Sequence, residues 1–243
     1  MRIGVITDIH ANLQALQAVL KDLEDAQIDY LACLGDVVGY GGQPDECCTL
    51  IRRSADVTIR GNHDAAVSKQ MDYSFYRQAA REALDEHRSC LSDENLAWLA
   101  ALPSYEIVQD VMFCHGAPPR IEAFDYLFTK QQVTPLVERY AEQAWVTFIG
   151  HSHLCKGFEF TPEGATEMLK TRYPLKSTSK YIISAGSVGQ PRDYDARACS
   201  VVLDLANSEF EYRRVPYDFE AAGSMIRKRG ISPAFAQRLA LGV

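Results

Sequence analysis

Six histidines occur in this 243-residue chain, and five of them stand in short polar motifs that follow apolar, strand-like runs. The motifs also contain carboxylates and an amide, so they offer only oxygen and imidazole nitrogen as ligand atoms. Such a donor set suits a pair of divalent ions of the Mn, Fe, Co, Ni or Zn type and requires no thiolate. The candidate metal ligands are Asp8, His10, Asp36, Asn62, His115, His151 and His153.

The spacing of these residues indicates a centre that holds two ions. Asp8 and His10 are two positions apart at the end of an apolar run, so both can point at one ion. Asp36 follows the next apolar run, and a carboxylate between two ions can bridge them. Two ions about 3.5–4 Å apart hold the attacking and leaving oxygens of an in-line displacement and lower the pKa of bound water. A metal-bridging hydroxide then serves as the nucleophile without any serine or cysteine.

His63 has a different expected role, because it directly follows Asn62 and is therefore expected to lie beside the ions. A histidine in that position can protonate a leaving alkoxide, which contributes a factor of about 10²–10⁴ in rate. Asp64 either orients His63 or caps the helix that follows, and the sequence leaves both roles open. His87, the remaining histidine, lies in a polar helical stretch and is expected on a solvated face.

The elements that must position these residues alternate between apolar runs and amphipathic stretches. Residues 2–7 predict a buried strand, and leucines every three or four positions predict a helix over 12–26 with Asn12 as its N-cap. Such alternation favours a parallel sheet with helices on its faces, whose active site lies at the carboxyl ends of the strands. Further strands are predicted at 30–34, 57–60, 104–109, 111–114, 145–149, 156–160, 165–170, 181–184, 198–205 and 209–215, and further helices at 44–53, 74–101 (two), 131–143 and, as the last, 219–228.

Length, charge and cysteine usage exclude several classes of protein. The length predicts a single domain over 1–243, and the strand-rich second half predicts a second sheet packed on the first. A net charge of −7 with no dense Lys/Arg block argues against a general nucleic-acid surface. No apolar run is long enough for a membrane span or a secretion signal. Seven scattered cysteines without a C-x-x-C pair predict a reduced, cytoplasmic protein. The oligomeric state stays open.

The order of the motifs resembles the calcineurin-like metallophosphoesterase superfamily. That pattern is D-x-H at 8–10, G-D at 35–36, G-N-H-D at 61–64, H at 115 and G-H-x-H at 150–153. The stretches 35–41 and 186–192 are similar to a branch of small single-domain bacterial and archaeal phosphodiesterases. The resemblance implies a four-layer α/β/β/α sandwich in which helices flank two packed mixed sheets. It also implies a phosphoesterase that uses two divalent ions, with Mn favoured.

The resemblance divides the seven candidate ligands into two sets joined by one bridge. Asp36 is the implied bridge, and His63 acts on the leaving group or the transition state. The implied ligands are Asp8, His10 and His153 for one ion, and Asn62, His115 and His151 for the other.

One motif departs from the pattern of the phosphoprotein phosphatases, which extend it to G-D-x-x-D-R. Gly39 and Tyr40 stand where the Asp and Arg would be, which argues against a Ser/Thr protein phosphatase. The departure makes Arg192 the expected phosphate clamp, because a guanidinium donates two parallel hydrogen bonds to phosphate oxygens. Asn62 and Gly189 complete the candidate substrate-binding set, although Gly189 can equally shape a tight turn.

The predicted substrate is a small phosphoester or nucleotide. Hydrolysis of a phosphodiester is the first expectation, with monoesters also open, and a dinucleoside polyphosphate or another nucleotide is the alternative. An inactive scaffold on the same fold is disfavoured because every motif is complete. The aromatic pairs at 75–76 and at 124 and 126 are interpreted as core or lid residues rather than a nucleobase platform.

Overall fold

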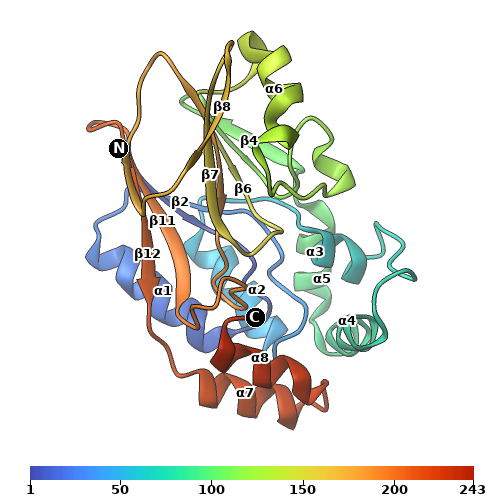
Figure 1. The fold of residues 1–243 in the computed structure, drawn as a ribbon. Coiled ribbons are helices and arrows are strands. Elements are labelled where there is room, and N and C mark those ends of the chain that lie inside the picture. Colours follow the sequence, from blue (N-terminus) through green and yellow to red (C-terminus); the bar gives the residue numbers. More distant parts are fainter.

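The computed structural model describes all 243 residues and shows two six-stranded mixed sheets that pack face to face (Figure 1). Helices flank the outer face of each sheet, so the expected α/β/β/α sandwich is confirmed. Side chains of both sheets form the core between them. Phe113 and Phe148 contribute from one sheet, and Val5, Val201 and Phe210 contribute from the other.

The first sheet has the strand order β3-β2-β1-β11-β12-β9. β1 is parallel to β2, which is parallel to β3, whereas β11 runs antiparallel to β1. The two strands predicted at 198–205 and 209–215 are β11 and β12, and they form a hairpin in which Asp204 pairs with Glu209 across the turn. The strands are β1 (Arg2–Ile6), β2 (Tyr30–Cys33), β3 (Val57–Thr58), β9 (Arg172–Pro174), β11 (Ala198–Asp204) and β12 (Glu209–Val215).

The second sheet has the strand order β4-β5-β6-β10-β7-β8. Its centre is parallel, because β6 pairs in parallel with both β5 and β10, and the remaining pairs are antiparallel. Parallel strands at the centre of both sheets let several loops leave from carboxyl ends. The strands are β4 (Tyr105–Val108), β5 (Val111–Cys114), β6 (Val146–Ile149), β7 (Cys155–Thr161), β8 (Gly164–Met168) and β10 (Lys180–Ala185).

The helices pack through apolar faces that the sequence pattern encodes. α1 buries Leu16, Val19 and Leu23 on the first sheet, and the Asn12 side chain caps it by accepting from the Ala15 amide at 3.1 Å. No helix combines the length and the apolarity needed to cross a membrane. The helices are α1 (Leu13–Asp25), α2 (Pro44–Ser54), α3 (Asn62–Val67), α4 (Gln78–Cys90), α5 (Asp93–Ala101), α6 (Thr134–Glu138), α7 (Phe219–Lys228) and α8 (Pro233–Leu241).

Two helix predictions were wrong. The continuous helix expected over 131–143 is one short α-helical segment, α6, between 3₁₀ turns. Pro135 lies in its first turn, where proline favours a helix start and cannot continue a helix from upstream. The helix at 219–228 is not the last, because α8 follows it after Ser232 and Pro233. α8 packs beside α7 through Phe235 and Leu239 (Figure 1).

Candidate metal centre

The structure brings together seven candidate ligands that are far apart in the sequence. Each lies in a loop or helix that directly follows a strand, and the strands belong to both sheets. The ligands therefore meet at the edge where the carboxyl ends of the parallel strands converge. Asp8 and His10 follow β1, Asp36 follows β2, Asn62 follows β3, His115 follows β5, and His151 and His153 follow β6.

Asp8, His10 and His153 form one buried group of potential ligands. The Asp8 Oδ1 atom lies 3.1 Å from His153 Nε2 and 3.6 Å from His10 Nε2. That oxygen is buried and has no hydrogen-bond partner, which is costly for a carboxylate unless a cation contacts it. Metal–nitrogen bonds of about 2.0–2.1 Å place two ligands of one ion about 3 Å apart, so this group fits a divalent ion.

Asp36, His115 and His151 form a second group next to the first. Asp36 Oδ2 lies 3.4 Å from His115 Nε2 and 3.8 Å from His10 Nε2, so it faces both groups. Asn62 Oδ1 lies 3.2 Å from His115 Nε2 and adds a neutral oxygen. Asp36 therefore lies between the two groups, and Asn62 lies beside the second one.

Backbone carbonyls fix the proton of three histidine rings. Nδ1 of His10 faces the Val38 carbonyl at 2.9 Å, and Nδ1 of His115 faces the Leu34 carbonyl at 2.8 Å. Nδ1 of His153 faces the Gln190 carbonyl at 2.5 Å. Because a carbonyl only accepts, each Nδ1 donates, and in the neutral ring Nε2 then keeps its lone pair. All three Nε2 atoms point into the cluster, which is the tautomer and orientation that metal ligation requires.

Five of the seven candidate ligands have a left-handed backbone. Non-glycine residues rarely adopt a positive φ, and each instance costs about 1–3 kcal/mol. Backbone hydrogen bonds hold these loops, for example from the Asp8 amide to the Gly35 carbonyl and from the His10 amide to the Asp36 carbonyl, both at 2.9 Å. The φ angles are 52° for Asp8, 47° for His10, 51° for Asp36, 69° for His151 and 59° for His153.

The electrostatics of the cluster favour the metal-binding forms of its two carboxylates, of His151 and of His153, whereas those of His115 favour the protonated ring. Burial raises the pKa of Asp8 and of Asp36, but the facing histidines outweigh it and hold both pKa values below the ordinary range. Burial lowers the pKa of His151 to about 3 and that of His153 to about 4. For His115 the Asp36 charge outweighs burial and raises the pKa to about 9. Ionised carboxylates and neutral imidazoles are the forms that ligate metals.

Tyr76 orients the amide of Asn62, a role that the sequence analysis missed. The Asn62 Nδ2 atom donates to the Tyr76 hydroxyl at 2.6 Å, which leaves Oδ1 turned toward His115. Tyr76 lies in the segment before α4, and nothing in its local pattern distinguishes it from a core aromatic. The contact depends on a tertiary approach of residues 14 positions apart.

His63 lies in the first turn of α3 next to the cluster, and its ring lines the pocket above it. Its amide donates to Asp36 Oδ1 at 2.8 Å, and its ring packs against Tyr40 with the centroids 4.6 Å apart. The buried Nδ1 atom has no hydrogen-bond partner. Gly39, with φ of +96°, makes this placement possible, because a Cβ there would lie 2.2 Å from His63 Nδ1.

Asp64 does not orient His63, so the catalytic role assigned to it from the sequence is not supported. Its carboxylate accepts from the amides of Asp36 at 2.7 Å, Val37 at 3.0 Å and Gly61 at 3.0 Å. The contact with Gly61 caps α3, which is the alternative that the sequence left open. Asp64 thus acts by holding the loop that carries Asp36.

Gly189 and Arg192, both predicted to contact the substrate, differ in their position relative to the pocket. Gly189 does not line the pocket: its amide donates to the Asp8 carbonyl at 2.9 Å, and a Cβ there would lie 1.8 Å from the Ile9 oxygen. The turn interpretation of Gly189 therefore fits the structure, and the substrate contact does not. Arg192 does line the pocket, and its Nε atom is buried without a hydrogen-bond partner.

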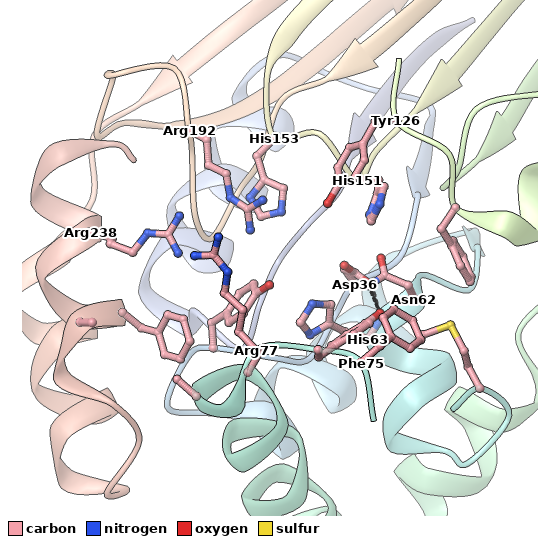
Figure 2. A pocket seen from close by; sticks show the side chains of 18 of the residues that line it. Asp36, Asn62, His63, Phe75, Arg77, Tyr126, His151, His153, Arg192 and Arg238 are labelled. Atoms are coloured by element: carbon pink, nitrogen blue, oxygen red, sulfur yellow. Dashed lines mark hydrogen bonds between the residues drawn. The ribbon is translucent and has the colours of Figure 1, made fainter. Parts of the chain in front are cut away.

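A pocket of about 710 Å³ opens above the cluster (Figure 2). Asp36, Asn62 and His151 lie on one side of it, and Figure 2 shows Arg77, Arg192 and Arg238 on the other. The sequence analysis missed Arg77 and Arg238, which come from the start of α4 and from α8. The volume lies within the range of about 300–1,000 Å³ that is usual for small-molecule sites.

His87 is buried, contrary to the expected solvated position. Its Nδ1 accepts from the Gly39 amide at 3.0 Å, and its Nε2 donates to the Gly41 carbonyl at 2.8 Å. His87 therefore holds the glycine-rich loop that packs against His63. The spacing could have revealed this, because His87 follows the buried Ala80, Ala83 and Leu84 at helical intervals.

Fold and site together define an α/β/β/α protein with a buried cluster of potential metal ligands below a pocket, and comparison with known proteins identifies its family. The family model of calcineurin-like phosphoesterases matches residues 1–176, and this chain belongs to that family. An uncharacterized protein of Methanocaldococcus jannaschii is 35% identical over 246 residues, which cover 99% of this chain and 98% of that protein.

Two solved structures resemble the whole chain. The crystal structure of a metallophosphoesterase from Sphaerobacter thermophilus shares 31% identity and has a TM-score of 0.83, covering 100% of this chain and 99% of that chain. A hypothetical protein from Pyrococcus horikoshii OT3 shares 16% identity with a TM-score of 0.80, covering 100% and 98%. The second likeness shows that the fold persists where most of the sequence differs.

Proposed function

We propose that this protein hydrolyses phosphodiester bonds, and monoesters as a second possibility, with two divalent metal ions. The observation that carries the proposal is the set of three Nε2 atoms, on rings whose Nδ1 faces a backbone carbonyl, that converge with two carboxylates beside the pocket. Such a set does not stabilise a protein core, because it buries several polar groups and leaves some of them without a hydrogen-bond partner.

The residues divide between two ions as the geometry groups them. Asp8, His10 and His153 would hold one ion; Asn62, His115 and His151 would hold the other; and Asp36 would contact both. Bound ions at these places would supply Lewis acidity and a nucleophile derived from water near neutral pH. Manganese is the proposed native metal, and iron, zinc, cobalt and nickel suit the same donors.

The side chains around the pocket bind and protonate the substrate in this proposal. Arg192 donates to the non-bridging phosphate oxygens, because its buried Nε has no partner within the protein. His63 donates a proton to the alkoxide that leaves as its bond to phosphorus breaks. Burial keeps the pKa of His63 below its ordinary value, and an anionic phosphate beside the ring favours the protonated form.

A dinucleoside polyphosphate or another nucleotide is the alternative substrate. Aromatic side chains in the pocket favour this alternative. Phe75 is 74% exposed, and the ring of Tyr126 stacks on His151 with the centroids 4.0 Å apart. A free aromatic face can stack on a nucleobase.

The test is hydrolysis of bis(4-nitrophenyl) phosphate by the purified protein with Mn²⁺ and with EDTA. We expect activity with the metal, loss of activity with the chelator, and a fall of about 10²–10⁴ in kcat for His63→Ala. Elemental analysis should find the metal content of His63→Ala equal to that of the parent protein. Absence of hydrolysis of diesters, monoesters and diadenosine tetraphosphate with every metal offered would overturn the proposal.

A further inference from the structure

Three arginines from separate elements meet on one side of the pocket, next to His153 (Figure 2). Arg77 precedes α4, Arg192 follows β10, and Arg238 lies on α8. Figure 2 shows the three guanidinium groups turned toward one another within the pocket. The sequence positions give no hint of this convergence, because only the packing of α8 near the start of α4 creates it.

None of the three guanidinium groups forms an ion pair with an Asp or Glu side chain. The two carboxylates nearest to Arg192 in the sequence are engaged elsewhere: Asp193 pairs with Arg214, and Asp195 pairs with Arg197 at 2.6 Å. Arg238 Nε donates to the Val243 carbonyl at 2.7 Å, and Arg192 Nε is buried without a partner. Most of the donor capacity of the trio is therefore free to face the pocket.

Like charges gathered in this way repel one another unless an anion lies among them. Burial lowers the pKa of Arg238, and the positive charges of Arg192 and Arg77 lower it further. A guanidinium stays protonated under these conditions, so the strain is relieved by binding a negative group rather than by losing a proton. Planar donor forks suit phosphate oxygens in particular.

We propose that Arg77 and Arg238, beside Arg192, form a subsite for a second phosphate group of the substrate, distinct from the hydrolysed group to which Arg192 donates. The inference rests on the proposed function, which places the scissile phosphate beside Asp36 and His151. The pocket of about 710 Å³ has room for both groups and the moiety that joins them. The preferred substrate then carries two phosphates, and a simple diester is a poor one.

Two kinds of compound supply such a second phosphate. It is either a terminal monoester elsewhere on the molecule or an internal phosphate of an oligophosphate chain. Thymidine 5′-(4-nitrophenyl phosphate) and the same compound with a 3′-phosphate form a matched pair that tests the terminal group. Diadenosine tetraphosphate tests the internal one.

The experiment compares the metal-loaded parent protein with Arg77→Gln, Arg238→Gln and the control Arg53→Gln. Arg53 is exposed on α2 and lies outside the pocket lining, so its substitution removes the same charge from the surface. We expect KM for the preferred two-phosphate compound to rise about tenfold in each pocket variant. KM for the single-phosphate compound should rise less than about threefold, and Arg53→Gln should match the parent.

Binding of inorganic pyrophosphate, measured by calorimetry on the same proteins, tests the arginine subsite even if no substrate is hydrolysed. A Kd raised about tenfold in Arg77→Gln and Arg238→Gln, but not in Arg53→Gln, supports the subsite. Equal Kd values in all four proteins, or KM values for both two-phosphate compounds that do not change in Arg77→Gln and Arg238→Gln, overturn it. If the parent hydrolyses no ester yet shows the pyrophosphate pattern, the proposed function fails and the anion subsite stands.

Discussion

The Nε2 atoms of His10 and His153 lie 3.1 Å apart, and in the neutral rings neither atom carries a proton to share with the other. Both rings donate their Nδ1 proton to a backbone carbonyl, to Val38 in one case and to Gln190 in the other. Two lone pairs at this separation repel each other, and the nearby Asp8 Oδ1 has no hydrogen-bond partner. A cation that contacts all three atoms removes both penalties at once.

Metal binding should therefore stabilise the fold. A ligand that binds only the native state adds about 2.7 kcal/mol when its concentration is 100 times its Kd. We expect Mn²⁺ to raise the melting temperature and EDTA to lower it, as followed by thermal unfolding. Asp8→Asn should lose most of the metal-dependent rise. Identical melting curves with metal and with chelator would contradict this reading of the His10–His153 contact.

Replacing Tyr76 with Phe should weaken the metal site that contains Asn62. The substitution removes the oxygen that accepts from Asn62 Nδ2, so the amide no longer has a fixed orientation. Loss of such a supporting contact commonly costs about 10–100-fold in metal affinity. A metal titration should show one weakened step and one unchanged step.

Tyr73→Phe is the matched control for Tyr76→Phe. The Tyr73 hydroxyl donates to Asp85 at 2.5 Å on the surface and touches no candidate ligand. Both metal-binding steps should therefore stay at their parent values in this variant. Equal weakening in the two variants would mean that the aromatic segment acts through general packing rather than through the Asn62 contact.

Asp64→Asn should destabilise the protein because the carboxylate accepts from four backbone amides with two oxygens. An asparagine replaces one carboxylate oxygen with an NH₂ group, which faces backbone amides that also donate. Each buried donor left without an acceptor lowers the free energy of unfolding by about 1–3 kcal/mol. Urea unfolding should show a loss of that order. Asp25→Asn, which removes only an exposed pair with Lys21, should cost less than about 0.5 kcal/mol. Equal losses in the two variants would refute this role of Asp64.

The sequence predicts the positions of the candidate ligands well, because strand ends are readable from local pattern. Asp8 and Asp36 follow apolar runs that the structure shows as β1 and β2, and parallel strands bring their carboxyl ends to one edge. What the pattern cannot predict is the left-handed backbone at both residues, which the loop hydrogen bonds of the folded chain impose.

The walls of the pocket are harder to predict from the sequence than the candidate metal ligands below it. Arg77 and Arg238 are 161 positions apart in numbering and meet only because α8 packs near the start of α4. α8 was missed as a helix, so no sequence argument could place Arg238 near a substrate. Tyr76 and His87 likewise act through single tertiary hydrogen bonds, to Asn62 and to the glycine-rich loop.

His87 should make the stability of the protein depend on pH. Burial lowers its pKa to about 4, against about 6.5 in an unfolded chain. The neutral ring is required because Nδ1 accepts from the Gly39 amide while Nε2 donates to the Gly41 carbonyl. Protonation of Nδ1 would place an N–H of the ring opposite the Gly39 N–H and break this hydrogen bond.

The sign of the effect follows from proton binding. Between pH 4 and 6.5 the unfolded chain binds more protons at His87 than the native state does, so the free energy of unfolding falls as the pH falls. His87→Gln keeps an acceptor and a donor but does not titrate. From pH 7 to pH 4 the parent protein should lose about 3 kcal/mol more than His87→Gln, as measured by urea unfolding at each pH. Other titrating groups are shared by both proteins and cancel in the difference, so parallel curves would show that His87 keeps an ordinary pKa.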